Sequence, residues 1–338
     1  MFGSILVPLD GSQMADRILP HVAAIALKDG PPLTLLRVLE SDDEESTPVV
    51  PLAWHFAKAE AQAHLDEAAK QLEGFGLAAD TVLLEGGAAQ RIVEYAHKQG
   101  VDLLALSSHG QGGLSGWNVS GVAQKVIHRA GTSILLVRSS DEGGDELGRI
   151  DAEVIQYRRI LAPLDGSPRA ESALPLAGAL AERHSADLLV VHVVTRPEMI
   201  EHVPLTPEDV ALAERVVLRN KTEAEKYLEQ LQLRLPSGAQ TRVLVDDSVT
   251  GALDALIQQE QVDLVVLSAH GHSCHVQWPY SALVNSFITY GETSLLILQD
   301  LPSSDTRRSL AEPGAENSAI PTRRASEEGL NIRAHSEI

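Results

Sequence analysis

A duplication within the chain limits its fold more than any other feature. Residues 5–12 (ILVPLDGS) and 160–167 (ILAPLDGS) agree at seven of eight positions, at an offset of 155. Residues 101–110 (VDLLALSSHG) and 262–271 (VDLVVLSAHG) agree at seven of ten, at an offset of 161. A repeat this long indicates two copies of one domain rather than a solenoid of short repeats.

The repeat and the composition of the remaining segments predict the domain organisation. We expect a first domain over residues 1–140 and a second over 157–300. The segment 141–156 is rich in glycine and acidic residues and is predicted to be an exposed linker. Residues 301–338 are polar and lack aliphatic periodicity, so we expect a disordered tail.

Each copy alternates aliphatic strands with helical segments. In the first copy we expect strands over 5–10, 33–38, 80–85, 101–107 and 132–138, and helices over 14–28, 57–74, 89–99 and 121–129. The strands are near-continuous aliphatic runs, which is typical of a parallel sheet covered by helices on both faces. The pattern predicts a doubly wound α/β fold, in which ligands bind beyond the carboxyl ends of the strands.

Composition narrows the class of function. The net charge is −20, and so acidic a surface repels a phosphate backbone and an anionic lipid face; we expect no nucleic-acid or membrane partner. The single cysteine, Cys274, excludes an internal disulfide and suits a reducing compartment. With no basic start or long apolar core of a signal peptide, the sequence predicts a cytoplasmic protein.

Three blocks in order carry a family resemblance. They are the PLDGS segment after the first strand, the small-x-His-Gly loop after the fourth, and the VAQKVIxxA segment before the last strand. In both copies the chain resembles the universal stress protein family. The resemblance implies two Rossmann-like doubly wound domains, each with a five-stranded parallel sheet, arranged as a pseudo-dimer. It also implies ATP as a ligand of some members.

The family's ATP-binding loop has the form Gly-x2-Gly-x9-Gly-Ser/Thr. In the first copy this pattern falls on Ser107, Gly110, Ser120 and Gly121, with Gly112 and Gly113 keeping the loop flexible. The resemblance thus implies an adenine nucleotide in the first domain only. Small residues let backbone N–H groups approach the phosphates, and the following helix adds the positive end of its dipole.

The same resemblance implies binding roles outside the loop. Pro8 and Asp10 would lie near the ribose or phosphates, and the backbone of Val38 near the adenine edge. Asp10 has an equally weighted alternative as a turn and helix-capping residue, because Asp-Gly-Ser after a strand favours both. His109 is predicted to orient the loop rather than to perform chemistry.

The second copy has changed at the corresponding loop. HGHSCHVQWP (270–279) aligns without gaps to HGQGGLSGWN (109–118), so Ser273 and Cys274 replace two glycines. Because added side chains would crowd a triphosphate, we expect a degenerate pocket that binds nucleotide poorly or not at all. The segment 270–275 holds three histidines and a cysteine, but ligands this close rarely complete a zinc tetrahedron, so we interpret it as a loop remnant and predict no metal site.

These observations favour a non-catalytic stress-response module in which the first domain senses adenine nucleotide. The alternative is a scaffold for an unknown protein partner, with both pockets vestigial. Walker-type, dinucleotide-binding and hydrolase-elbow motifs are absent, and no activating base can be named, so we expect no enzyme activity. The aliphatic segments 132–138 and 293–299 are predicted to pair with each other or with another chain in a homo-oligomer.

Overall fold

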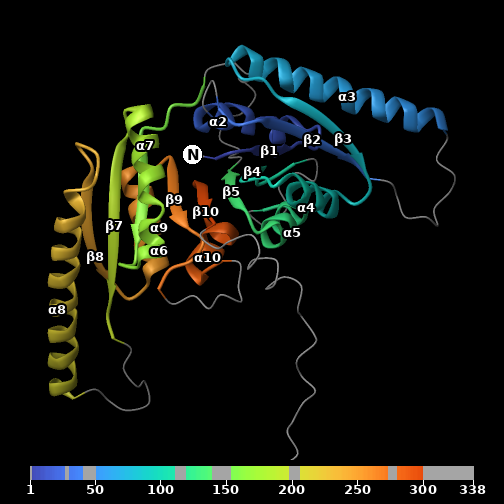
Figure 1. Cartoon of the computed structure of the whole chain (residues 1–338). Helices are drawn as coiled ribbons and strands as arrows, with labels where there is room; N and C mark the ends of the chain where they lie inside the picture. Colours follow the sequence, from blue (N-terminus) through green and yellow to red (C-terminus); the bar gives the residue numbers. More distant parts are fainter. Residues whose placement is uncertain are drawn as a thin grey trace, which may run out of the picture.

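In the computed structural model one sheet of ten strands runs through both copies (Figure 1). The structure describes residues 2–26, 30–40, 51–110, 119–138, 154–197, 206–272 and 280–299. The strands of the first copy are β1 (Ile5–Pro8), β2 (Leu33–Leu39), β3 (Asp80–Glu85), β4 (Leu103–Ser107) and β5 (Ser133–Val137). Those of the second copy are β6 (Arg159–Leu164), β7 (Asp187–Thr195), β8 (Gln240–Asp246), β9 (Leu264–Ser268) and β10 (Ser294–Leu298).

The strand order is β3-β2-β1-β4-β5-β10-β9-β6-β7-β8. Within each copy all neighbouring strands are parallel, which confirms the predicted α/β class with five parallel strands per copy. The chain reverses its direction of winding between β1 and β4, and again between β6 and β9. In sheets of this kind a crevice opens at such a point, beyond the carboxyl ends of the two strands.

The closing strands of the two copies join the half-sheets. Strands β5 and β10 are antiparallel, with Leu135 opposite Leu296, so the predicted pairing of these segments is confirmed within one chain. The Arg138 guanidinium strengthens this junction by donating to the carbonyls of Phe287 and Ile288, at 2.6 and 2.8 Å. A second hydrogen bond crosses from the second copy to the first, because the Tyr280 hydroxyl donates to the Ile127 carbonyl at 3.0 Å.

Helices cover both faces of the sheet. The first copy has α1 (Gln13–Asp16), α2 (Ile18–Ile25), α3 (Pro51–Gly74), α4 (Ala88–Gln99) and α5 (Gly121–Ala130). The second has α6 (Pro168–Glu171), α7 (Leu174–His184), α8 (Pro207–Gln232), α9 (Val249–Glu260) and α10 (Ala282–Tyr290). One continuous core contains residues of α1–α3 and α6–α8, and the other contains residues of α4, α5, α9 and α10. Both cores extend across the junction.

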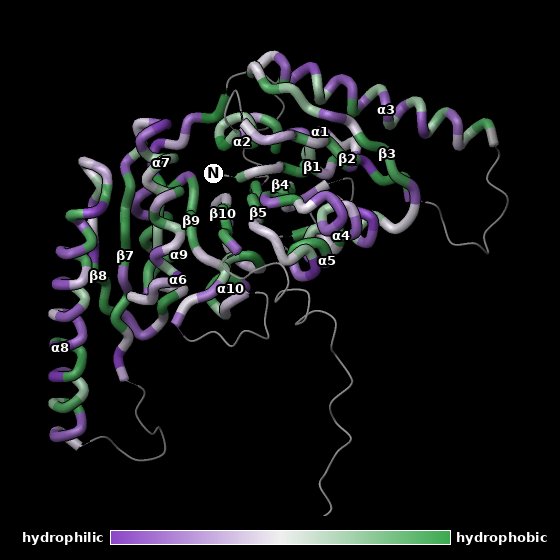
Figure 2. Tube along the Cα trace, in the orientation of Figure 1, coloured by the Kyte–Doolittle hydropathy of each residue, from purple (hydrophilic) through white to green (hydrophobic). Residues whose placement is uncertain are grey.

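Hydropathy follows this layering. Figure 2 shows hydrophobic residues concentrated along the central strands, while α3 and α8 carry many hydrophilic ones. In β1 the side chains of Ile5, Leu6 and Val7 are all buried, although they point alternately to opposite faces. This is the burial expected of a parallel strand that is covered on both sides.

The expected helix over 14–28 is instead two helices, α1 and α2, with Arg17 between them. Pro20 explains the break, because it has no N–H for the carbonyl of Asp16 and its ring would collide with that carbonyl. The second copy repeats the break: Pro175 follows Glu171, the last residue of α6, by four positions. Helix α3 begins at Pro51, before the predicted residue 57.

Several predicted segments lie outside the described residues. They include most of the linker, 139–153, and the whole tail, so the domain boundaries stay a prediction. Within the part of the chain that the structure describes, no helix has the length and apolar character needed to cross a membrane.

Candidate functional site

Asp10 and Gly110 meet at the carboxyl ends of β1 and β4, in the crevice of the first copy. Asp10 Oδ1 accepts hydrogen bonds from the N–H and the hydroxyl of Ser12, at 2.9 and 2.6 Å. Its other oxygen, Oδ2, occupies the space where a Cβ on Gly110 would stand. Asp10 is therefore a turn residue, as one of its two interpretations predicted, and it also packs directly on the glycine of the predicted binding loop.

A positive charge lies beside this turn. Gly11 has a φ of +85°, a conformation that glycine adopts without strain. A Cβ at Gly11 would be 2.6 Å from the guanidinium of Arg37, which extends from β2 across the turn. The crevice of the first copy thus combines one carboxylate with one guanidinium.

Helix α5 begins at the same crevice. Ser120 caps it, because its Oγ accepts from the N–H of Ala123 at 3.3 Å and its own N–H donates to the Ser108 carbonyl at 2.7 Å. Gly121 is the first helical residue, and a Cβ there would meet nothing within 4 Å. Helix α5 therefore begins without a side chain at its first residue, and the N-terminus of a helix favours an anion.

The other predicted residues lie on neighbouring strand ends. Pro8 ends β1, Val38 lies on β2 and Ser107 ends β4, where its hydroxyl donates to the Met14 carbonyl at 3.3 Å. Gly112 and Gly113 lie outside the described residues.

His109 is buried at the base of the predicted loop, with Nδ1 at 3.0 Å from the Ser108 hydroxyl. Its predicted role in orienting the loop stays a prediction, because residues 111–118 lie outside the described ranges.

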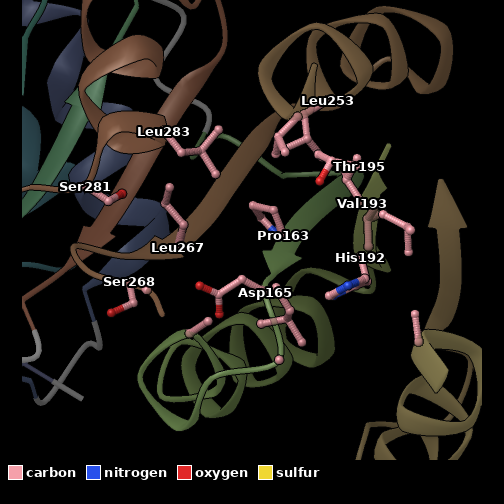
Figure 3. A pocket seen from close by; sticks show the side chains of 18 of the residues that line it. Pro163, Asp165, His192, Val193, Thr195, Leu253, Leu267, Ser268, Ser281 and Leu283 are labelled. Atoms are coloured by element: carbon pink, nitrogen blue, oxygen red, sulfur yellow. The ribbon is translucent and has the colours of Figure 1, made fainter. Parts of the chain in front are cut away.

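The second copy has a cavity of about 810 Å³ at the equivalent crevice. Strands β6, β7 and β9 and helices α8, α9 and α10 supply its walls. Figure 3 shows Leu253, Leu267 and Leu283 gathered around Pro163, with Asp165, just after the end of β6, and His192, on the neighbouring strand β7, below them. A cavity of this size is in the range that holds a small organic ligand.

Three polar side chains of this cavity distinguish it. The Asp165 carboxylate accepts from the Ser167 N–H at 2.9 Å and from the His272 N–H at 2.5 Å. Burial raises the pKa of Asp165, but hydrogen bonds from Ser167 and His272 outweigh it and bring the pKa below its usual value. Nδ1 of His192 and Oγ of Ser268 are both buried without a hydrogen-bond partner among the described residues.

His192 is held against an aromatic neighbour. Its ring stands edge-on to Tyr227 with centroids 6.2 Å apart. Burial lowers the pKa of His192, and the Leu164 backbone and the charge of Asp165 only partly oppose that effect. The imidazole is therefore neutral at neutral pH.

The sequence analysis missed these cavity residues, although the repeat contained the signal. The offset of 155 relates Pro8, Asp10 and Val38 to Pro163, Asp165 and Val193. The offset of 161 relates Ser107, Gly110, Ser120 and Gly121 to Ser268, Gly271, Ser281 and Ala282. All seven counterparts line the cavity, so the second copy brings together the positions predicted for the first.

The expectation that the loop substitutions crowd the second pocket stays a prediction. Ser273 and Cys274, the substituted loop residues, lie outside the described residues. The described walls of the crevice are formed by strand ends and helices, and they enclose the cavity of about 810 Å³. Gly271 also keeps the function seen at Gly110, since a Cβ there would overlap the Asp165 carboxylate.

The two crevices differ most in charge. His192 stands at the position equivalent to Arg37, and a Cβ at Gly166, the counterpart of Gly11, would meet nothing within 4 Å. No lysine or arginine lines the second cavity among the residues described, whereas Asp165 and Glu223 do.

The interpretation of the loop after β9 as a remnant without a metal site stays a prediction. His270 and His272 are described, but Cys274 and His275 are not. Within the described ranges, no three His, Cys, Asp or Glu side chains are grouped as a metal site would require.

Both copies of the chain match a known protein family. The sequence model of the universal stress protein family matches residues 1–138 and 156–277. A universal stress protein of Mycobacterium tuberculosis is 24% identical over 274 residues, covering 79% of this chain and 87% of the relative. One of Methanocaldococcus jannaschii is 28% identical over 141 residues, covering 41% of this chain and 83% of the relative.

Solved structures agree with the fold. A protein of unknown function from Pseudomonas aeruginosa superposes with a TM-score of 0.63 at 14% identity, covering 92% of this chain and 98% of that one. A universal stress protein from Archaeoglobus fulgidus superposes with a TM-score of 0.57 at 15% identity, covering 88% and 98%. At these identities the likeness concerns the fold alone.

Proposed function

Because the chain belongs to the universal stress protein family, we propose that it is a non-catalytic, cytoplasmic stress-response module whose first copy binds ATP. The observation that carries the proposal is the grouping of Arg37, Asp10 and the start of α5 beyond the carboxyl ends of β1 and β4. A guanidinium and the N-terminus of a helix favour phosphate oxygens, and a carboxylate accepts hydrogen bonds from ribose hydroxyls.

The absence of catalysis is part of the proposal. Asp10 Oδ1 already accepts two hydrogen bonds from Ser12, and His109 is buried against its own neighbour Ser108. We take these contacts as structural, because Asp10 holds its own turn and His109 and Ser108 are both buried. ATP would therefore act as a signal that the first copy senses.

Titration calorimetry of ATP into the full chain tests this function. Val38→Trp would fill the first crevice, and Val193→Trp is its matched control in the second. We expect one ATP site that disappears with Val38→Trp and persists with Val193→Trp, and no phosphate release. If wild type bound no ATP, or released phosphate faster than the Val38→Trp variant, the proposal would be wrong.

A partner-binding scaffold is the second candidate, and α8 gives the observation that favours it. Val210, Leu212 and Leu218 on the first half of this helix are exposed by 43%, 51% and 66%. Apolar side chains exposed along one helix are typical of a protein contact. The scaffold would be favoured if the wild-type protein bound no ATP but captured a specific partner protein, and if Leu218→Glu abolished that capture.

A further inference from the structure

The two halves of helix α8 differ in how they pack on the rest of the chain. The helix has 26 residues, and its buried side chains, Ala224, Leu228 and Leu231, all lie in its second half. Figure 1 shows α8 along the outer side of β7 and β8, at one end of the sheet. The first half is therefore placed where another protein surface can reach it.

This first half is apolar on most of its circumference. Residues 210–218 read VALAERVVL, in which seven of nine side chains are apolar. Ala213 and Val217 continue the inward row of Ala224 and are partly buried, but Leu212 and Val216 are 51% and 37% exposed. A helix that is apolar on its outer side as well is typical of one that a further protein surface covers.

The charges of the same half are divided by sign along the helix. Residues 207–214 hold three acids and no base, and residues 215–221 hold three bases and no acid. Neither Arg215 nor Arg219 makes an ion pair within the described structure, whereas Lys221 pairs with Glu225. Two such helices in antiparallel orientation would place each acidic end against a basic end, and a parallel pair would place like charges together.

An antiparallel pair centred on residue 214 also matches the apolar side chains. One face of the helix is formed by residues at spacings of four, four and three, which are Glu208, Leu212, Val216 and Arg219. Leu212 and Val216 are equally distant from the centre, so each lies opposite the other in a second molecule. Glu214 is two residues from both of them and points away from this face, so the two central carboxylates do not meet.

We propose that two molecules of this chain associate through this face of α8, as a symmetric and antiparallel pair of helices. Leu212 of each molecule packs on Val216 of the other, and Glu208 of each pairs with Arg219 of the other. The contact is isologous, so one set of residues serves both sides. A pair of half-helices buries less than the roughly 1,200 Å² of a standard interface, so the association is weak and requires a high protein concentration. The pair forms whether or not the first copy binds ATP.

Helix α3, the counterpart of α8 in the first copy, provides a matched control. Leu52 and Phe56 on its first half are exposed by 62% and 66%. Residues 51–63 carry Lys58 and Glu60 as their charged side chains, so this half has apolar surface without the division of charge. We therefore expect α3 to stay outside the contact.

Sedimentation velocity of the full chain over a hundredfold range of concentration is the first test. We expect the wild type to pass from monomer to dimer as the concentration rises. Leu212→Gln should keep the protein monomeric, and Phe56→Gln should leave the dimer in place. Both residues are exposed, and circular dichroism with melting curves establishes that each variant is folded.

Reversal of charge tests the antiparallel geometry. Arg219→Glu should raise the dimer Kd at least about tenfold, because Glu208 of the other molecule then faces a carboxylate. Adding Glu208→Arg to the same chain should bring the Kd back to within about threefold of wild type, since the symmetric contact exchanges both partners at once. A chain that stays monomeric at every concentration, or a dimer that Phe56→Gln removes and Leu212→Gln preserves, would overturn the proposal. Failure of Glu208→Arg to restore association would overturn it as well.

Discussion

The carboxylate of Asp10 occupies the space that a side chain at Gly110 would need, and Asp165 stands in the same relation to Gly271. This contact explains why a glycine follows the buried histidine in both copies. Gly110 is therefore required by packing, and this requirement can be measured separately from the nucleotide binding proposed for the first copy.

Gly110→Ala should lower the free energy of unfolding by about 1–3 kcal/mol, because the new Cβ displaces the Asp10 carboxylate. In an Asp10→Ala background the same change should cost much less, since the obstructing group is gone. Gly121→Ala is the control, because a Cβ there meets nothing within 4 Å. Urea unfolding of the four variants measures the coupling, and additive effects would contradict the packing explanation.

Arg138 should be a main determinant of how firmly the two copies are joined. Burial lowers the pKa of Arg138 to about 10, and its guanidinium donates to two carbonyls at the end of α10. Arg138→Leu leaves both carbonyls without this donor and should destabilise the protein by about 2–4 kcal/mol in urea. Arg196→Gln, which removes an exposed pair with Asp247, should cost less than about 1 kcal/mol. Equal losses for the two variants would argue against the role of Arg138.

The contact of His21 with Tyr157, also across the copies, should make stability depend on pH. Nδ1 of His21 lies 3.0 Å from the Tyr157 hydroxyl, and burial lowers the pKa of His21 from 6.5 to about 4. The unfolded chain binds a proton at His21 as the pH falls through 6.5, whereas the folded chain does so only near pH 4. Stability should therefore be full above pH 6.5 and decline toward pH 4, by an amount on the order of 3 kcal/mol from this residue.

His21→Gln should weaken the pH dependence of stability between pH 6.5 and pH 4. Part of that dependence should remain, because burial also lowers the pKa values of His128, His184 and His192. His55→Gln is the control, because His55 is exposed on α3. Melting temperatures at pH 4.5, 5.5 and 7.5 would provide the comparison. Parallel curves for wild type and His21→Gln would show that this histidine does not govern the response.

His192→Arg should give the second copy the charge of the first. An arginine there has room above Gly166, where a Cβ would meet no atom within 4 Å. We expect ATP stoichiometry to rise from one to two per chain in calorimetry, because the guanidinium offsets Asp165 and Glu223. His192→Gln, which is neutral, should leave it at one. A stoichiometry of one in His192→Arg would mean that charge is not what separates the two crevices.

The aliphatic runs and the duplicated blocks predicted the strands, their parallel arrangement and the pairing of β5 with β10, because each depends on patterns that span many residues. The break at Arg17 was missed, since the apolar spacing continues through it and only Pro20 signals the interruption. The degenerate second pocket predicted from Ser273 and Cys274 stays a prediction, because both residues lie outside the described ranges. The cavity walls come from strand ends distant in sequence, which the loop alignment did not reveal. The exchange of Arg37 for His192 was visible at the offset of 155, and its meaning required knowing that both residues border a crevice.

The antiparallel junction of β5 and β10 has a genetic consequence. When two identical subunits meet through such strands, every substitution occurs twice, and both binding sites change together. Here one polypeptide supplies both sides of the junction, so a codon change alters one crevice and leaves its counterpart intact. An arginine on one side and a histidine on the other are then compatible with a single ten-stranded sheet. The fused pair keeps the architecture of a dimer while its two sites are free to acquire different ligands at a constant ratio of one to one.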